Sequence, residues 1–113
     1  MLKHDIKEKI NKKSISLEEY GLNDLAWNKE DAEKLIHEIM TDEIGIFGGD
    51  VYKLTSTNLE SLTENWSCEP TDKESEREYY LRSKTESLKY IKNYPIQPGE
   101  KILFSITFTE KII

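Results

Sequence analysis

Residues 101–111, KILFSITFTEK, alternate in side-chain character with a period of two. One side of the segment carries Ile102, Phe104, Ile106 and Phe108. The other side carries Leu103, Ser105, Thr107 and Thr109. An alternation of this length predicts a β-strand with one buried face. It is the clearest strand pattern in the sequence.

A helical period replaces this alternation in the segment that follows Asn28. Apolar side chains recur there at i, i+3, i+4, i+7 and i+8, namely at Ala32, Leu35, Ile36, Ile39 and Met40. This spacing predicts a helix with one buried stripe. Asn28 is placed to cap its N-terminus, and Trp27 to pack on Ala32 as a hydrophobic staple. His37 lies beside the stripe with no second metal ligand at suitable spacing, and we interpret it as a boundary residue.

Two further segments start with the Ser/Thr-x-x-Glu spacing of a capping box. The first, at residues 16–19, predicts a short helix over residues 17–21. The second, at residues 71–74, predicts a long helix that ends near Asn93, because the residue before Pro95 avoids helical geometry. The expected apolar face of the long helix consists of Tyr80, Leu81, Leu88 and Ile91.

Two segments joined by a polar connection predict a pair of strands: residues 44–54, IGIFGGDVYKL, and residues 62–70, LTENWSCEP. The alternation in the first segment slips at Gly48 and Gly49. Such a slip is typical of a bulge, or of a place where another backbone or an aromatic ring lies close. We expect Trp66 to point into the core and to lie against this bare backbone.

These elements predict an α+β fold, with an antiparallel β-sheet and two main helices packed on one of its faces. A length of 113 residues is that of one domain, so residues 1–113 are expected to form a single domain. Residues 1–15 fit either a frayed helix or an edge strand, and they could be peripheral to the domain.

The formal net charge of −6 is distributed unevenly. Residues 1–13 contain five lysines and two acids, which leaves 11 basic and 20 acidic side chains in residues 14–113, a charge of −9. A surface of that sign repels nucleic acid and anionic membranes, and it attracts a basic protein partner. The same charge can also serve solubility alone, and the sequence leaves both interpretations open.

Cys68 is the only cysteine, so neither an internal disulfide nor a thiolate zinc cluster can form. No apolar run is long enough to cross a membrane, and the charged N-terminus does not fit a signal peptide. We therefore expect a cytoplasmic protein that has no cofactor, no metal and no contact with nucleic acid or membrane. The oligomeric state cannot be read from the sequence.

Catalytic sites need a nucleophile beside a base, paired carboxylates or a metal cluster, and the sequence does not indicate such a set. Residues 48–50, GGD, lead into a strand and not into a helix, so they do not predict a phosphate-binding loop. One alternative is a small hydrolase or transferase, in which Asp50 and His37 act as acid and base in a cleft between sheet and helix. Another is a subunit or adaptor that forms a homo-oligomer through a strand edge.

Three segments resemble a known family when they are taken together: IFGGDVYKL (46–54), NWSCEP (65–70) and YYLRSKTESLKYIKNYP (79–95). With the ED-A-x-x-LI pattern that starts at Glu30, they are similar to the fortieth family of immunity proteins of bacterial polymorphic toxin systems. These systems include those of contact-dependent growth inhibition. The resemblance covers about residues 27–108. The basic N-terminal segment has no counterpart in it, and its role stays open.

The resemblance implies a non-catalytic protein that binds the C-terminal domain of a toxin and blocks it. Many such toxin domains are nucleases with basic clefts, which an acidic inhibitor can occupy. The acids expected to contact the toxin lie on the two long helices, with a slight preference for the second. They are Asp72, Glu74, Glu76 and Glu78 on the second helix, and Glu30, Glu33 and Glu38 on the first.

The residues of the family motifs fit a structural role better than a direct toxin contact. They are Gly48, Gly49, Asp50, Trp66, Ser83, Tyr90 and Tyr94. Ser83 and Ser87 are small enough to let a strand or another helix approach the long helix. On this interpretation, Asp50 accepts hydrogen bonds from the amides of the bulge, from Ser83 or from a tyrosine hydroxyl.

Overall fold

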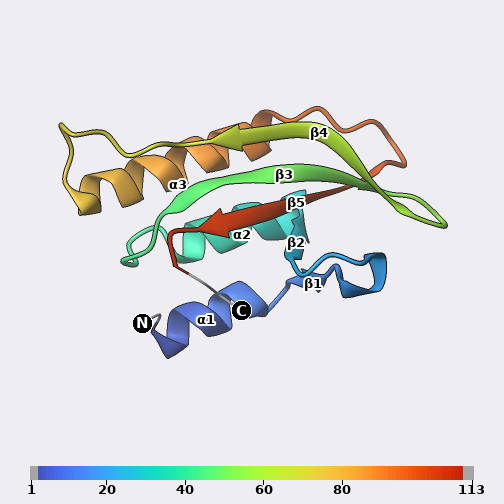
Figure 1. Cartoon of the computed structure of the whole chain (residues 1–113), viewed down its shortest axis with the longest axis horizontal. Coiled ribbons are helices and arrows are strands. Elements are labelled where there is room, and N and C mark those ends of the chain that lie inside the picture. Colours follow the sequence, from blue (N-terminus) through green and yellow to red (C-terminus); the bar gives the residue numbers. More distant parts are fainter. Residues whose placement is uncertain (1–2, 111–113) are drawn as a thin grey trace.

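Five antiparallel strands form one sheet in the computed structural model, which describes residues 3–110 (Figure 1). In chain order they are β1 (Ile15–Ser16), β2 (Leu25–Asn28), β3 (Ile46–Leu54), β4 (Leu59–Ser67) and β5 (Lys101–Phe108). Their order in the sheet is β1-β2-β5-β3-β4. The strand that comes last in the sequence is therefore the central one, and it joins β2 to β3.

Three α-helices and one turn of 3-10 helix complete the fold: α1 (His4–Asn11), η1 (Glu18–Tyr20), α2 (Lys29–Glu38) and α3 (Glu76–Asn93). Helices α2 and α3 lie next to each other across one face of the sheet, and α1 packs against α2 (Figure 1). The main core fills the space between sheet and helices. The predicted α+β class is confirmed, as is the antiparallel sheet with its two main helices on one face.

The N-terminal segment is helical, which decides between the two predicted alternatives. Ile6 and Ile10 lie one turn apart on α1, and both are buried against the main core. The predicted short helix is only the single turn η1, which ends at Gly21. Its predicted capping box is wrong, because the Ser16 hydroxyl accepts a hydrogen bond from the amide of Glu18 at 3.3 Å and does not cap an α-helix.

Helix α3 begins one turn later than predicted. Its N-cap is Ser75, which forms a complete capping box with Glu78. The predicted cap at Thr71 belongs to a turn that precedes the helix. The buried face also differs from the prediction, since Leu81 is 52% exposed. Buried positions recur every fourth residue instead, at Tyr79, Ser83, Ser87 and Ile91.

The strands also differ from the predicted segments at their ends. Strand β4 starts earlier than expected, because the chain reverses within residues 55–58, where the amide of Thr55 donates to the carbonyl oxygen of Asn58 at 2.8 Å. The sequence pattern does not predict β2, since four residues are too few to show an alternation. Asn28 ends β2 and also caps α2, where its side chain accepts a hydrogen bond from the amide of Asp31 at 2.8 Å, as predicted.

Strand β3 is irregular on both of its edges, as its two glycines predict. Its register shifts against β5 just before Gly48, and against β4 just after Asp50. Gly48 has a φ of +152°, a value that side chains rarely allow, and a Cβ atom there would collide with the carbonyl oxygen of Trp66. The predicted bulge is therefore confirmed.

The indole ring of Trp66 lies directly against the backbone of Gly49. A Cβ atom added at Gly49 would collide with this ring and with the carbonyl oxygen of Ser105, so the predicted close approach is confirmed. The indole N–H donates a hydrogen bond to the Ser87 hydroxyl at 2.9 Å, and the ring stacks on Tyr90 with 4.8 Å between centroids. One tryptophan thus connects β3, β4 and α3.

Helix α3 also bonds to the sheet near its middle and just after its last residue. Near the middle, the Ser83 hydroxyl accepts a hydrogen bond from the amide of Ile46 at 2.9 Å. Near its end, the Tyr94 hydroxyl donates to the carboxylate of Glu64 at 2.7 Å, and the Tyr94 ring packs edge-on against Phe104. These contacts attach the helix to β3, β4 and β5.

Asp50 takes no part in this packing. Val51 lies in the main core under the helices, so alternation places Asp50 and Tyr52 on the opposite face of the sheet. The Asp50 side chain is exposed, and none of the described hydrogen bonds reaches its carboxylate. The predicted hydrogen bonds of Asp50 to Ser83, to a tyrosine hydroxyl or to the bulge are therefore wrong, because the side chain points away from α3.

A lysine lies in the interior between the two main helices. Lys84 of α3 is 1% exposed, and its ammonium group donates to the carbonyl oxygens of Ile39 and Asp42 at 2.9 and 2.7 Å. These carbonyl groups follow the C-terminal end of α2, where a cation is favourable. Burial nevertheless lowers the pKa of Lys84 to about 8, because a charged amine is harder to remove from water than a neutral one.

Replacing Gly49 by valine should lower the free energy of unfolding by about 1 to 3 kcal/mol, because the new side chain collides with an aromatic ring and a carbonyl group. Urea unfolding of the variant and the wild type measures the difference. The control is Gly99→Asn, since Gly99 has open space around it and a φ of +85°, which asparagine tolerates. Equal unfolding midpoints for Gly49→Val and the wild type would contradict the contact.

The pKa of Lys84 leads to a second prediction. In the unfolded chain, this amine titrates near its ordinary value of 10.5. Between the two pKa values the unfolded chain binds more protons than the folded protein, so this group makes stability rise with pH. The free energy of unfolding of the wild type should therefore increase relative to that of Lys84→Met from about pH 7.5 to about pH 9.5. Chemical denaturation at both pH values tests this, and a constant or falling difference would refute it.

Candidate functional site

The predicted acids at the start of α3 differ in their freedom to bind a partner. The Glu74 carboxylate accepts two hydrogen bonds from the guanidinium of Arg82, at 2.6 and 2.9 Å, and these lower the pKa of Glu74. The Glu78 carboxylate accepts a hydrogen bond from the amide of Ser75 at 2.8 Å, which lowers the pKa of Glu78. Two predicted acids are exposed and have no cation partner within residues 3–110: Asp72 and Glu76.

Arg82 lies at the centre of a cluster that fixes the connection between β4 and α3. Besides its contact with Glu74, it donates to the carboxylate of Glu86 and to the carbonyl oxygen of Glu69, each at 2.7 Å. The thiol of Cys68 lies in the same cluster. Burial and a hydrogen bond to Glu86 raise the pKa of Cys68 to about 11. The thiol therefore stays protonated and unreactive near neutral pH.

The predicted acids of α2 are partly neutralised by neighbouring lysines. Glu30 lies 3.2 Å from Lys34, one turn further along the helix. Glu38 lies 3.9 Å from Lys12, which directly follows α1. Glu33 is half-buried and has no cation partner in the described part of the chain. Of the α2 acids, two of three are thus paired within the protein.

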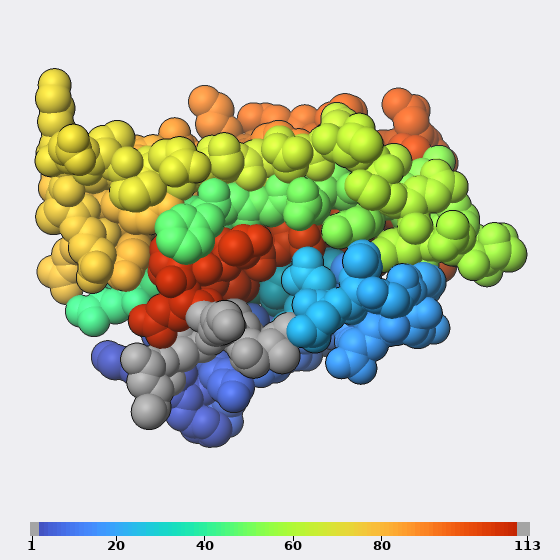
Figure 2. Space-filling model, viewed as in Figure 1, coloured from blue at the N-terminus to red at the C-terminus, as the bar shows by residue number. Residues whose placement is uncertain are grey.

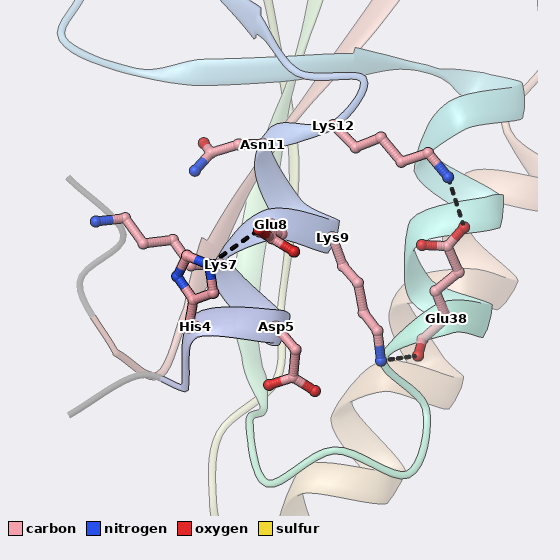
Figure 3. A pocket seen from close by; sticks show the side chains of 8 residues that line it. All are labelled: His4, Asp5, Lys7, Glu8, Lys9, Asn11, Lys12 and Glu38. Carbon is pink, nitrogen blue, oxygen red and sulfur yellow. Dashed lines mark hydrogen bonds and ion pairs between the residues drawn. The ribbon is translucent and has the colours of Figure 1, made fainter.

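The basic N-terminal segment supplies partners for the acids at the end of α2. Figure 3 shows Lys9 of α1 and Lys12, just after this helix, directed toward Glu38. Lys9 donates to the backbone carbonyl of Glu38 at 3.2 Å and to the carboxylate of Asp42 at 3.0 Å. The hollow along α1 is lined by charges of both signs, so it does not form an anionic surface.

A second hollow, of about 390 Å³, lies between the end of α2 and the start of α3. Its lining includes the apolar side chain of Leu81, which is largely exposed, and the half-buried ring of Tyr80. Glu43 and Glu76 also line the hollow, and the carboxylate of Glu43 lies 4.0 Å from the guanidinium of Arg77. The predicted acid Glu76 thus lies beside exposed apolar surface, while its neighbour Glu43 has a cation close by.

The second face of the sheet is only partly covered, by the segment around η1, whose Leu17, Tyr20 and Leu22 pack against Ala26 and Leu103. Within residues 3–110, no α-helix crosses the face opposite α2 and α3, and Figure 2 shows β4, β3 and β5 side by side on it. This face carries Asp50 on β3 and Asp24 immediately before β2. Burial, followed by the charge of Asp50, raises the pKa values of Asp24 and Tyr52. Sequence reasoning does not single out Asp24, because only the strand order brings it near Asp50.

The alternative acid–base pair is not assembled. His37 is exposed on α2, whereas Asp50 lies on the sheet face that points away from α2. The two side chains cannot act together across a cleft between sheet and helix, so that prediction is wrong. Among residues 3–110, no group of three His, Cys, Asp or Glu side chains could hold a metal ion. None of the helices in this range is long and apolar enough to cross a membrane.

One protein family matches the chain. The family model described as Immunity protein 40 matches residues 16–108. No curated protein and no solved structure matches the chain. The matched range confirms the resemblance drawn from the motifs and extends it toward the N-terminus. It contains α2, α3 and four complete strands together with the end of β1, and it leaves out α1.

Replacing Glu74 by glutamine should lower the midpoint of urea unfolding, because it removes the carboxylate that holds Arg82. The double variant Asp72→Asn/Glu76→Gln should lower the midpoint by less, since neither carboxylate has a cation partner within residues 3–110 and only the favourable interaction of Glu76 with the N-terminus of α3 is lost. Equal midpoints for these two variants would contradict the distinction between paired and available acids.

Proposed function

Because this chain belongs to the Immunity protein 40 family, we propose that it binds and neutralises one cognate bacterial toxin domain by covering the active site of that domain. The family match over residues 16–108 carries this proposal, because it spans both main helices and almost the whole sheet. Membership of an immunity family implies an inhibitor and not an enzyme. The structure is consistent with this, since the one acid–base pair suggested by the sequence is separated by the sheet.

The charge of the protein favours a basic toxin domain, and we propose a nuclease. Nuclease clefts that bind phosphate groups are basic, and an acidic protein can occupy such a cleft in place of the substrate. Residues 14–113 carry a formal charge of −9. Opposite charges also speed association, because they guide the partners together before contact. A nuclease toxin would meet its substrate inside the cell, so we expect inhibition to take place in the cytoplasm.

Several acids have no ion pair within residues 3–110, and we propose two surfaces among them as candidates for the toxin contact. One is the start of α3, where Asp72 precedes the helix and Glu76 lines the hollow beside Leu81. The other is the open face of the sheet, with Asp24 and Asp50. The remaining predicted acids are less suited to the role, because they hold Arg82, cap α3, lie half-buried or pair with lysines. A toxin contact at either surface would combine charge with apolar anchors.

Co-expression with the adjoining reading frame tests the proposed function. The product of that frame should stop growth when it is expressed alone in a bacterial host, and this protein should restore growth when both are made. Colony counts with separately inducible plasmids give the measurement, and a catalytically inactive toxin variant is the control for the burden of expression. A harmless neighbour, or toxicity that persists in the presence of this protein, would argue against the immunity function.

A further inference from the structure

Two carboxylates flank a buried hydroxyl group on the open face of the sheet. Ser105 lies on the central strand β5, where its cross-strand partners are Asp50 of β3 on one side and Ala26 of β2 on the other. Asp24 comes two residues before Ala26. Side chains two residues apart along a strand share a face, so Asp24, Ser105 and Asp50 lie on the same side of the sheet.

The hydroxyl group of Ser105 has no hydrogen-bond partner within the described residues, although its side chain is only 1% exposed. A buried hydroxyl without a partner is uncommon, because its lost contact with water is not compensated. The Ser105 hydroxyl lies near enough to Asp24 to favour the ionised form of that carboxyl group. Its geometry to Asp24 falls short of a full hydrogen bond, and its oxygen is closed to solvent, so the hydroxyl group has to turn toward the surface to meet a ligand.

The protein does not neutralise these carboxylates itself. Asp24 accepts one hydrogen bond, from the amide of Leu25 at 2.8 Å, and neither Asp24 nor Asp50 forms an ion pair among residues 3–110. Lys53 lies on β3 like Asp50, but its side chain points to the other face of the sheet, where it pairs with Glu100 at 3.3 Å. After burial, the charge of Asp50 is the main influence that raises the pKa of Asp24. Uncompensated repulsion of this kind is typical of binding sites.

An apolar anchor lies beside the two acids. Phe47 is 44% exposed and lines a shallow hollow of about 260 Å³ together with Asp50, Asn65 and Thr107. A neighbouring hollow of about 440 Å³ connects Phe47 with Asp24. An exposed aromatic ring next to unpaired charges matches the composition of strong protein-binding sites.

We infer that Asp24 and Asp50 together bind one arginine side chain of the toxin domain, with the Ser105 hydroxyl as a third acceptor, so that the open face of the sheet is the toxin-binding face. This inference rests on the proposed function. A guanidinium group has five N–H donors in one plane, so it can serve two carboxylates and a hydroxyl at once, which a lysine ammonium does less well. Phe47 would pack against the apolar surface around that arginine.

The hollow between α2 and α3 is the alternative candidate for the toxin-binding surface. Its acids are less suited to bind a basic partner. There Glu43 lies 4.0 Å from Arg77, and Asp42 is paired with Lys9 at 3.0 Å. Each of these acids already has a cation close by, and no buried group in that hollow lacks a partner among the described residues.

Binding to a catalytically inactive toxin, measured by calorimetry, tests the inference. The double variant Asp24→Asn/Asp50→Asn keeps the shape of both side chains and should bind about 100-fold more weakly than the wild type. Its unfolding midpoint should stay the same or rise, because repulsion between the carboxylates is relieved. The control Asp72→Asn/Glu76→Gln removes the same amount of charge at the other surface, and it should weaken binding by less than about 3-fold.

The outcomes separate the inference from the proposed function. If the wild type and Asp24→Asn/Asp50→Asn bind with equal affinity, the inference is overturned and the immunity function stands. A large loss in the control variant alone would assign binding to the start of α3 instead. Failure of the wild-type protein to bind or neutralise the toxin would count against the proposed function itself.

Two further measurements test the roles of Ser105 and of the two carboxylates directly. Ser105→Ala should reduce toxin affinity by about 10-fold without lowering the unfolding midpoint, because the hydroxyl has no partner to lose in the free protein. Nuclear magnetic resonance with a blocked arginine amide needs no toxin. The backbone amide signals of Asp24, Asp50 and Ser105 should shift in the wild type and not in Asp24→Asn/Asp50→Asn. Unchanged signals, or shifts confined to α3, would overturn the inference.

Discussion

The contact between the bare backbone of Gly49 and the indole ring of Trp66 determines how the layers of this protein fit together. Without a side chain at Gly49, the ring can lie flat on β3 and still donate a hydrogen bond to Ser87 of α3. The same close approach lets Ser83 reach the start of β3. Because successive side chains of a strand point to opposite faces, packing Gly49 and Val51 against the helix side directs Asp50 to the other face.

Signals that act within a few residues of each other predict the fold well. The cap at Asn28 and the stripe from Ala32 to Ile39 need only the local chain, and both are present. Strand β5 is present too, but the prediction of a single buried face is wrong, because Leu103 and Ser105 on its second face are also buried. The buried face of α3 differs from the predicted one, because it depends on partners that are distant in the sequence. Ser83 and Ser87 are buried since Ile46 and Trp66 bond to them, whereas Leu81, an apolar residue, faces water. Periodicity alone cannot reveal such preferences.

The candidate site shows the same limit in terms of charge. Composition identifies an acidic protein, but it does not tell which carboxylates already have partners. Glu74 forms an ion pair with Arg82. Glu38 pairs with Lys12, which lies far from it in the sequence. Asp24 and Asp50 lie on either side of Ser105 because β5 pairs with both β2 and β3. The acids predicted from the sequence lie on α2 and α3. The two acids that the fold places on either side of Ser105, Asp24 and Asp50, are not among them.

The central position of β5 has a consequence for how the polypeptide acquires its shape during synthesis. Strands β1 and β2, and strands β3 and β4, can pair as soon as each has been made, yet nothing in the sheet links these two pairs until residues 101–108 follow. Until then, β2 and β3 each present an unpaired edge that invites wrong association. The nascent chain should thus stay vulnerable to aggregation and proteolysis until β5 has been made, and chaperone protection would be most useful up to that point.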